Sequence, residues 1–265
     1  MSKNIVKKLN DSIIKDYPKI NQKETFYFEC KPGLSCFNKC CNDVNIFLTP
    51  YDIIRLKNRL NISSSVFLNK YTLLPLEENL KHPVVMLKMD DESLNCPFVS
   101  EQGCSVYEDR PWACRMYPIG VASQKKSNKT EDDYYFIIKE NVCKGFESEK
   151  KWTVDKWMKD QQVEIYNGMG ELFKEISLHK RFLSNIPVEP VKLEMFYMVC
   201  YDLDKFREFI FKSSFLQRFD IEPLTIEKIK EDDTELLKFG FDWLKFSIFG
   251  EKTINLQQRY ALNNQ

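Results

Sequence analysis

The sequence is poor in glycine and histidine, and it has no excess of either charge. Its 8 glycines in 265 residues assemble no G-x-G-x-x-G or phosphate-binding loop, and the nearest stretch, NGMGELF, lies inside a helical pattern. Lys+Arg and Asp+Glu both total 39, so no basic face is indicated. The usual nucleotide-cofactor fingerprints are therefore excluded, and nucleic acid is not expected as a partner.

Long apolar runs are also missing. The longest, from Met195 to Tyr201, is far too short to cross a bilayer, and the N-terminal stretch lacks the apolar segment of a signal peptide. We therefore expect a cytoplasmic protein with no membrane partner. In that reducing compartment, cysteines serve more often as metal ligands or redox groups than in structural disulfides.

Cysteine is present in quantity, and it is unevenly distributed. Eight of the 9 cysteines lie in the first 143 residues, in turn-like contexts such as ECKPG, NKCCND, NCPF and VCKGF. Loops let thiolates converge, whereas cysteines used as small hydrophobes should scatter along apolar faces. We predict that these eight are metal ligands: Cys30, Cys36, Cys40, Cys41, Cys96, Cys104, Cys114 and Cys143. The ninth, Cys200 in MFYMVCYDL, is predicted to be packed in a core.

Two of these cysteines, Cys40 and Cys41, are adjacent. Neighbouring side chains point to opposite faces of a strand, and in a helical turn they diverge by about 100°. The pair therefore indicates either two sites back to back, or one ligand and one supporting thiol. Eight thiolates also match two four-thiolate sites in number.

Zinc and iron–sulfur clusters both accept four thiolates. Structural zinc usually shows two compact Cys-x2–4-Cys pairs, and here only Cys36-x3-Cys40 fits; the 2 histidines offer few mixed sites. The wide, irregular spacing and the Cys96-Pro97 dipeptide favour iron–sulfur. We therefore expect one or two iron–sulfur clusters of the 4Fe-4S type, with zinc as the alternative.

Local patterns predict a mixture of strands and helices. Residues 25–30 alternate like a strand, and Thr49, Pro50 and Asp52 are the start signals of a helix. Hairpins are predicted at 83–99 and at 119–140. Helical spacing predicts helices at 153–176, 202–219 and 225–249, and residues 191–203 are predicted to be extended.

These elements predict an α+β protein: a small Cys-rich metal-binding domain of hairpins and short helices, packed on a helical C-terminal domain. The predicted boundaries are an N-terminal helix at 1–25, the cysteine-cluster domain at 26–150 and the mainly helical domain at 151–265.

The stretches CFNKCC, IFLTPYDIIRL, NCPF, GCSVYEDRPWACRMYP and VCKG together resemble the YkgJ-type cysteine-cluster family, a zinc- or iron-chelating domain. The likeness spans residues 26–146, and its motifs are specific. The first cysteine group departs from the tight CxxCxxCC spacing used as a label, which leaves the role of Cys36 open. The resemblance implies a metal centre, commonly described as iron–sulfur, and the flagellin lysine methylase is a distant relative.

Four residues of YEDRPWACRMYP are candidates to surround the metal. The charges of Arg110 and Arg115 would offset those of the thiolates, and their N–H donors would tune the potential. Alternatively, these arginines pair with neighbouring acids and a carbonyl. Tyr107 and Tyr117 would shield the site from water, or simply pack in the core.

Three functions follow from these features. The leading one is an iron–sulfur protein in electron transfer or in an oxidoreductase, with an unidentified redox or protein partner. The second is a zinc-stabilised interaction module. The third is a protein-modifying enzyme similar to the lysine N-methylase, although no methyl-donor site is recognisable and no catalytic residue can be named.

Overall fold

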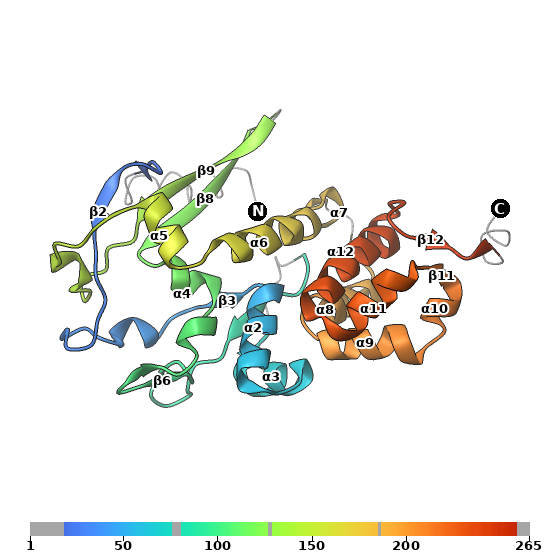
Figure 1. The fold of residues 1–265 in the computed structure, drawn as a ribbon, viewed down its shortest axis with the longest axis horizontal. Helices are drawn as coiled ribbons and strands as arrows, with labels where there is room; N and C mark the ends of the chain where they lie inside the picture. Colours follow the sequence, from blue (N-terminus) through green and yellow to red (C-terminus); the bar gives the residue numbers. More distant parts are fainter. Residues whose placement is uncertain (1–18, 76–80, 127–128, 185–186, 259–265) are drawn as a thin grey trace. The chain divides into compact units, whose positions relative to one another are not determined.

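The chain forms two compact units in the computed structural model, which describes residues 19–75, 81–126, 129–184 and 187–258 (Figure 1). Unit 1 consists of residues 19–44, Phe98–Ser105 and Trp112–Glu164. Unit 2 consists of Asn45–Pro97, Val106–Pro111 and the chain from Ile165 onward. Small sheets carry the cysteines and helices dominate the later part, so the predicted α+β class is confirmed.

Unit 1 is built mainly from short strands and turns. Its elements are β1 (Lys19–Ile20), β2 (Thr25–Tyr27), η1 (Lys39–Cys41), β6 (Val99–Ser100), β7 (Gly103–Cys104), α4 (Trp112–Met116), β8 (Ile119–Lys126), β9 (Lys129–Ile137), η3 (Gly145–Glu147), β10 (Lys151–Thr153) and α5 (Val154–Asp160). The strands pair in three antiparallel groups, in the orders β1-β9-β8, β10-β2 and β6-β7. The β8–β9 pair is the predicted hairpin at 119–140, and Figure 1 shows it as a long two-stranded ribbon.

A small aromatic core underlies these strands. The rings of Phe26 and Phe28 meet the Trp157 indole edge to face, at centroid distances of 6.1 and 5.5 Å. The Trp157 indole N–H donates to the Met116 carbonyl at 3.2 Å, and that of Trp152 donates to the Phe28 carbonyl at 2.8 Å. Both indoles are therefore satisfied, and the core holds the strand that leads to the first cysteine.

Unit 2 holds most of the helices. Its elements are β3 (Phe47–Leu48), α2 (Pro50–Leu60), α3 (Ser64–Tyr71), β4 (Thr72–Leu73), β5 (Val85–Leu87), η2 (Tyr107–Asp109), α6 (Glu164–Ser177, whose first residue belongs to unit 1), α7 (Lys180–Leu183), α8 (Pro190–Cys200), α9 (Leu203–Lys212), α10 (Phe215–Arg218), β11 (Phe219–Asp220), α11 (Pro223–Glu231), α12 (Asp233–Phe249) and β12 (Asn255–Leu256). Its strands pair antiparallel in the orders β3-β5-β4 and β11-β12.

The predicted start of α2 is confirmed in detail. The Thr49 hydroxyl accepts a hydrogen bond from the Asp52 amide at 3.2 Å, while the Asp52 carboxylate accepts one from the Thr49 amide at 2.7 Å. Pro50 is the first helical residue, where its missing N–H costs nothing. This reciprocal capping satisfies two backbone donors that would otherwise be unpaired.

The prediction of an extended segment at 191–203 is wrong. This segment forms α8, which begins at Pro190 and buries Phe196, Val199 and Cys200. A short apolar run does not distinguish a buried strand from a buried helix by periodicity. Proline at the first helical position and the packing of α8 against other helices of unit 2 favour the helix.

The predicted hairpin at 83–99 is also wrong. The central strand β5 is already paired on both edges, with β3 through Met86 and Phe47 and with β4 through Met86 and Leu73. No edge remains for the chain at 94–99, and β6 pairs instead with β7. The competing partners are close in space but distant in sequence, so the local pattern did not reveal them.

Three predicted helices are each divided, and a fourth prediction is partly outside the described residues. Gln162, with a φ of 54°, separates α5 from α6, and Asp232 caps α12 and separates it from α11. The helix predicted at 202–219 is likewise divided into α9 and α10. Residues 1–18 of the predicted N-terminal helix are not described, whereas Lys19–Ile20 form β1 rather than helix.

Candidate metal centre

The backbone of unit 1 brings the first and last predicted ligands into the same region. The β2–β10 pairing continues beyond β2, because the Glu29 amide donates to the Gly145 carbonyl at 3.0 Å. Cys30 directly follows Glu29, and Cys143 lies two residues before Gly145. A Cβ at position 145 would lie 2.6 Å from the Phe28 ring, so this close approach requires glycine.

The second predicted ligand is held at the same place by a backbone donor. The Lys144 amide donates to the Cys36 sulfur at 3.1 Å. After Cys36 the chain turns at Asn38, whose φ of 67° is left-handed, and enters η1. The Asn38 side-chain amide donates to the Ser100 carbonyl at 2.8 Å, which ties this turn to the β6–β7 hairpin. The turn carries Cys40.

Three other thiols influence the titration of Cys30. Burial is the largest cause that raises the pKa of Cys30 to about 11, followed by the thiolates of Cys40, Cys36 and Cys143. The Cys30 residue is exposed to solvent. The charges of the neighbouring thiolates are therefore better evidence about the site than burial is. Thiolates that raise the pKa of a neighbour in this way lie close enough for their charges to interact. We call Cys30, Cys36, Cys40 and Cys143 the four-cysteine group.

The adjacent thiols contact each other. The Cys41 thiol donates a hydrogen bond to Cys40, and this is the largest cause that lowers the pKa of Cys40 to about 7, against the opposing effect of burial. A hydrogen bond to the charged form favours that form. Of the two interpretations of the pair, this contact favours a ligand, Cys40, with a supporting thiol, Cys41.

Tyr117 is the aromatic neighbour of this group. Its ring meets Phe28 edge to face at 5.8 Å, and both Tyr117 and Cys143 pack against the core of unit 1. Burial raises the pKa of Tyr117 above its usual range, and the adjacent Cys143 thiolate raises it further as hydrogen-bond acceptor and as charge. By heavy-atom geometry, however, the buried hydroxyl has no hydrogen-bond partner among the described residues.

The other predicted ligands lie on different elements. Cys104 is in β7 and Cys114 is in α4; both are partly buried in unit 1. Cys96 belongs to unit 2. Their roles as ligands stay predictions. Cys200 in α8 is fully buried, which confirms that it is a packed thiol.

The two arginines have partners that the sequence left open. Arg115 is 2 % exposed and donates to the Gln161 carbonyl at 2.8 Å, so a carbonyl contact is present. Arg110, in unit 2, donates to the Tyr107 carbonyl and its guanidinium lies 3.8 Å from the centre of the Tyr107 ring. Tyr107 itself is 53 % exposed. The proposed influence of these residues on a metal stays a prediction.

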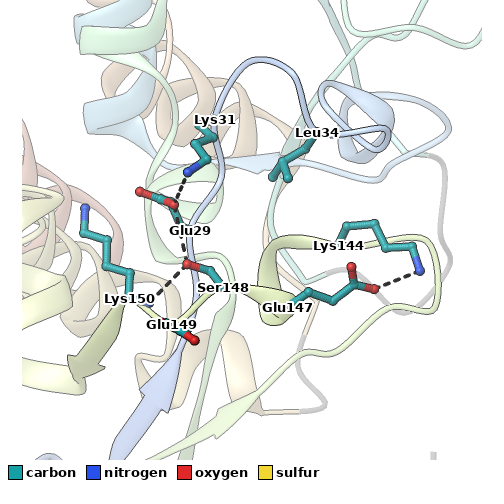
Figure 2. A pocket seen from close by; sticks show the side chains of 8 residues that line it. All are labelled: Glu29, Lys31, Leu34, Lys144, Glu147, Ser148, Glu149 and Lys150. Carbon is teal, nitrogen blue, oxygen red and sulfur yellow. Dashed lines mark hydrogen bonds and ion pairs between the residues drawn. The ribbon is translucent and has the colours of Figure 1, made fainter.

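A polar hollow of about 650 Å³ adjoins the segments that carry Cys30 and Cys143 (Figure 2). It is lined by Glu29, Lys31, Leu34, Lys144, Glu147, Ser148, Glu149 and Lys150. Figure 2 shows two ion pairs in it, Lys31 with Glu29 at 2.7 Å and Lys144 with Glu147 at 3.0 Å. The hydrogen bond from Lys31 is the largest cause that lowers the pKa of Glu29.

The donor set fits a thiophilic metal. Four thiols with a backbone N–H on the sulfur of Cys36 match the chemistry of zinc–thiolate and iron–sulfur sites. Within the described residues, no three or more Cys, His, Asp and Glu side chains have the arrangement of a formed metal site. The sulfurs are therefore gathered in one region but are not arranged as a coordination shell.

Sequence reasoning missed the groups that assemble the site. The Lys144 amide, the Gly145 close approach and the Phe28 carbonyl are backbone features or packing contacts, and none has a distinctive side chain. One signal was available: both ECKPG and VCKGF place Cys-Lys before a glycine, in turn-like contexts.

Comparisons with known proteins agree with the cysteine pattern. No curated protein and no solved structure matches the chain significantly. Among the described residues, no helix is long and apolar enough to span a membrane. Residues 29–144 match the CxxCxxCC family model, which is described as a "putative zinc- or iron-chelating domain". This cysteine-bearing part of the chain, which is less than half of its length, is therefore similar to the CxxCxxCC family of zinc- or iron-chelating domains.

Proposed function

We propose that the four-cysteine group holds a metal centre, and that this centre is an iron–sulfur cluster used in electron transfer or in an oxidoreductase. The observation that carries the proposal is that, after burial, the charges of Cys40, Cys36 and Cys143 raise the pKa of Cys30, which supports a common site for the four sulfurs. Four thiolates are the usual ligand set of a 4Fe-4S cluster, which would supply a one-electron redox step when bound.

The position of the group supports transfer to a partner. Cys30 and Cys40 are exposed residues, and the polar hollow of Figure 2 lies beside Cys30. A cluster ligated there would have an edge near the protein surface, where a redox partner could approach. The paired charges of the hollow suit a polar, transient encounter rather than a permanent apolar interface.

The choice of iron–sulfur over zinc rests on the ligands. All four are thiols, and they include only one compact pair, Cys36-x3-Cys40, whereas structural zinc sites usually show two. The family description allows either metal, so zinc in an interaction module is the competing function.

Anaerobic purification tests this directly. The full chain should be brown, absorb near 400 nm, and contain iron and acid-labile sulfide in equal amounts. A colourless protein that retains zinc after dialysis would overturn the iron–sulfur proposal and support the zinc module. Protein without bound metal, even after anaerobic reconstitution with either metal, would overturn both. Calorimetry with a methyl donor tests the third function, which predicts saturable binding.

The adjacent cysteines provide a second test. Cys40→Ser should lose the metal of the four-cysteine group, because serine is a much weaker ligand for a soft metal. Cys41→Ser should keep that metal if Cys41 is a supporting thiol. If each single change removes a different part of the metal complement, the pair serves two sites instead. If both variants keep all metal, Cys40 is not a ligand.

A further inference from the structure

Both histidines of the chain are in contact with one short helix of unit 2, α7. Of its four residues, all within the described part of the chain, one is buried, Phe182, which is 1 % exposed. The Phe182 ring meets the His82 imidazole at a centroid distance of 5.2 Å, and His179 is the residue that caps the helix. The contacts that hold α7 in place therefore centre on one buried ring and two imidazoles.

His179 can cap α7 in one protonation state only. Its Nδ1 accepts a hydrogen bond from the Arg181 amide at 3.2 Å, so this nitrogen carries no proton. Its Nε2 faces the Glu251 carboxylate at 3.4 Å, and its ring stacks on Phe249 of α12 at 3.6 Å. A proton on Nδ1 would set two N–H donors against each other, and the cap would be lost.

His82 lies in an aromatic pocket that also favours the neutral imidazole. Its ring contacts Phe173 of α6 and Phe196 of α8 at centroid distances of 6.4 and 4.8 Å. Its Nδ1 faces the Pro83 carbonyl at 3.0 Å. The carbonyls of Pro83 and Ser177 favour protonation, but burial among the rings outweighs them and lowers the pKa of His82.

The charged groups around His179 act in opposite directions. Burial is the largest cause that lowers the pKa of His179, and the Lys180 ammonium lowers it further, whereas the Glu251 carboxylate raises it. The pKa values of both histidines consequently lie below the 6.5 of a free imidazole. In mildly acidic solution, each histidine therefore takes up a proton more readily once it has left its folded site.

We propose that α7 is an acid-sensitive clasp, which detaches from α8 and α12 when the two histidines are protonated. The Phe182 ring meets Phe196 of α8 and Phe249 of α12 edge to face, at centroid distances of 5.4 and 5.5 Å. Detachment of α7 would uncover these rings and expose an apolar surface. The clasp lies within unit 2 and does not depend on the proposed metal centre.

Hydrogen exchange of the full chain, measured by mass spectrometry, tests the clasp. At about pH 5.5, one unit below the pKa of a free imidazole, each histidine should favour opening by up to about tenfold, and the two together by up to about 100-fold. After correction for the intrinsic pH dependence of exchange, α7 should lose protection by this factor relative to neutral pH, while α11 keeps its protection. An equal loss throughout unit 2 would indicate general acid unfolding and would overturn the clasp.

Two substitutions separate the contributions of the histidines. In His179→Asn the side chain can still accept from the Arg181 amide, and it does so at any pH. In His82→Phe the aromatic pocket is filled by a ring that cannot be charged. Each single variant should reduce the acid-dependent loss of protection to about tenfold, and the double variant should abolish it. A double variant with the full loss would overturn the inference.

An NMR titration of the wild-type chain tests the clasp even where a variant does not fold. The chain has two histidines, so two sets of imidazole signals report the two sites. Both sets should titrate below pH 6.5. An imidazole that titrates at or above this value would not resist protonation in the closed state, and this result would also overturn the clasp.

Discussion

The two units of this protein reach a defined structure by different means. In unit 1 most strands have two or three residues, and a small core around Phe28 and Trp157 supports loops that carry thiols. In unit 2 long helices bury stacked aromatic rings, such as Phe206 on Trp243 at 5.6 Å. Helices satisfy their own backbone, so unit 2 depends on side-chain packing. Unit 1 has fewer regular elements and should depend on its ligands.

Removal of the metal should give the largest difference in stability between the two units. Four thiolates on a structural ion can contribute on the order of 10 kcal/mol, which is comparable with the net stability of a whole domain, about 5–15 kcal/mol. After chelation, amides of unit 1 around the four-cysteine group should lose hydrogen-exchange protection, while those of α8, α9 and α12 keep it. Mass spectrometry of peptides measures this. Equal changes in both units would contradict the comparison.

Substitutions of single cysteines should show the difference between the two units more specifically. Cys30→Ser should lower bound metal sharply, because Cys30 belongs to the four-cysteine group. Cys200→Ser in unit 2 is the matched control: it should keep all metal and lower stability by about 1–3 kcal/mol, since it places a hydroxyl in an apolar core. Metal analysis and urea unfolding measure the two effects. Full metal content in Cys30→Ser would remove Cys30 from the ligand set.

Packing in unit 2 can be tested with two helical glycines. A Cβ on Gly240 of α12 would lie 2.6 Å from Val199 and 3.0 Å from Phe206, so Gly240→Ala should destabilise the protein by about 1–3 kcal/mol. Gly168 of α6 is exposed and has nothing within 4 Å of such a Cβ, so Gly168→Ala should stabilise by up to about 1 kcal/mol. Urea unfolding reports both changes. Similar effects of the two substitutions would show that α12 is not closely packed.

The smallest expected effect is a pH dependence in unit 2. Burial against Phe196 and Phe182 lowers the pKa of His82 below 6.5, so the folded chain holds this imidazole neutral. Below pH 6.5 the unfolded chain gains a proton that the folded one lacks, and stability falls toward the folded pKa. In His82→Phe the loss of stability between neutral and mildly acidic pH should be smaller. An unchanged pH profile would show that His82 does not contribute.

Local sequence patterns predicted many of the helices and strands, but they predicted little of how distant segments come together in each unit. The capping signals at Thr49, Pro50 and Asp52 identified α2 because a helix start depends on neighbouring residues. The extended prediction at 191–203 failed because the packing around α8, rather than its composition, favours a helix. Each predicted domain, 26–150 and 151–265, is one continuous segment of the chain. Each unit of the structure is instead assembled from three separated segments. Contacts between segments distant in sequence decide such an arrangement.

The same distinction holds for the site. The sequence by itself predicted that thiols are the donors and that Cys200 is not one of them, and it carries the likeness of residues 29–144 to a zinc- or iron-chelating domain, because these are matters of residue type and spacing. Only the tertiary structure decided that the segments that carry Cys30 and Cys143 lie side by side. The reason is physical: thiolates interact through space, and the pairing of Glu29 with Gly145 is a backbone contact across more than a hundred residues.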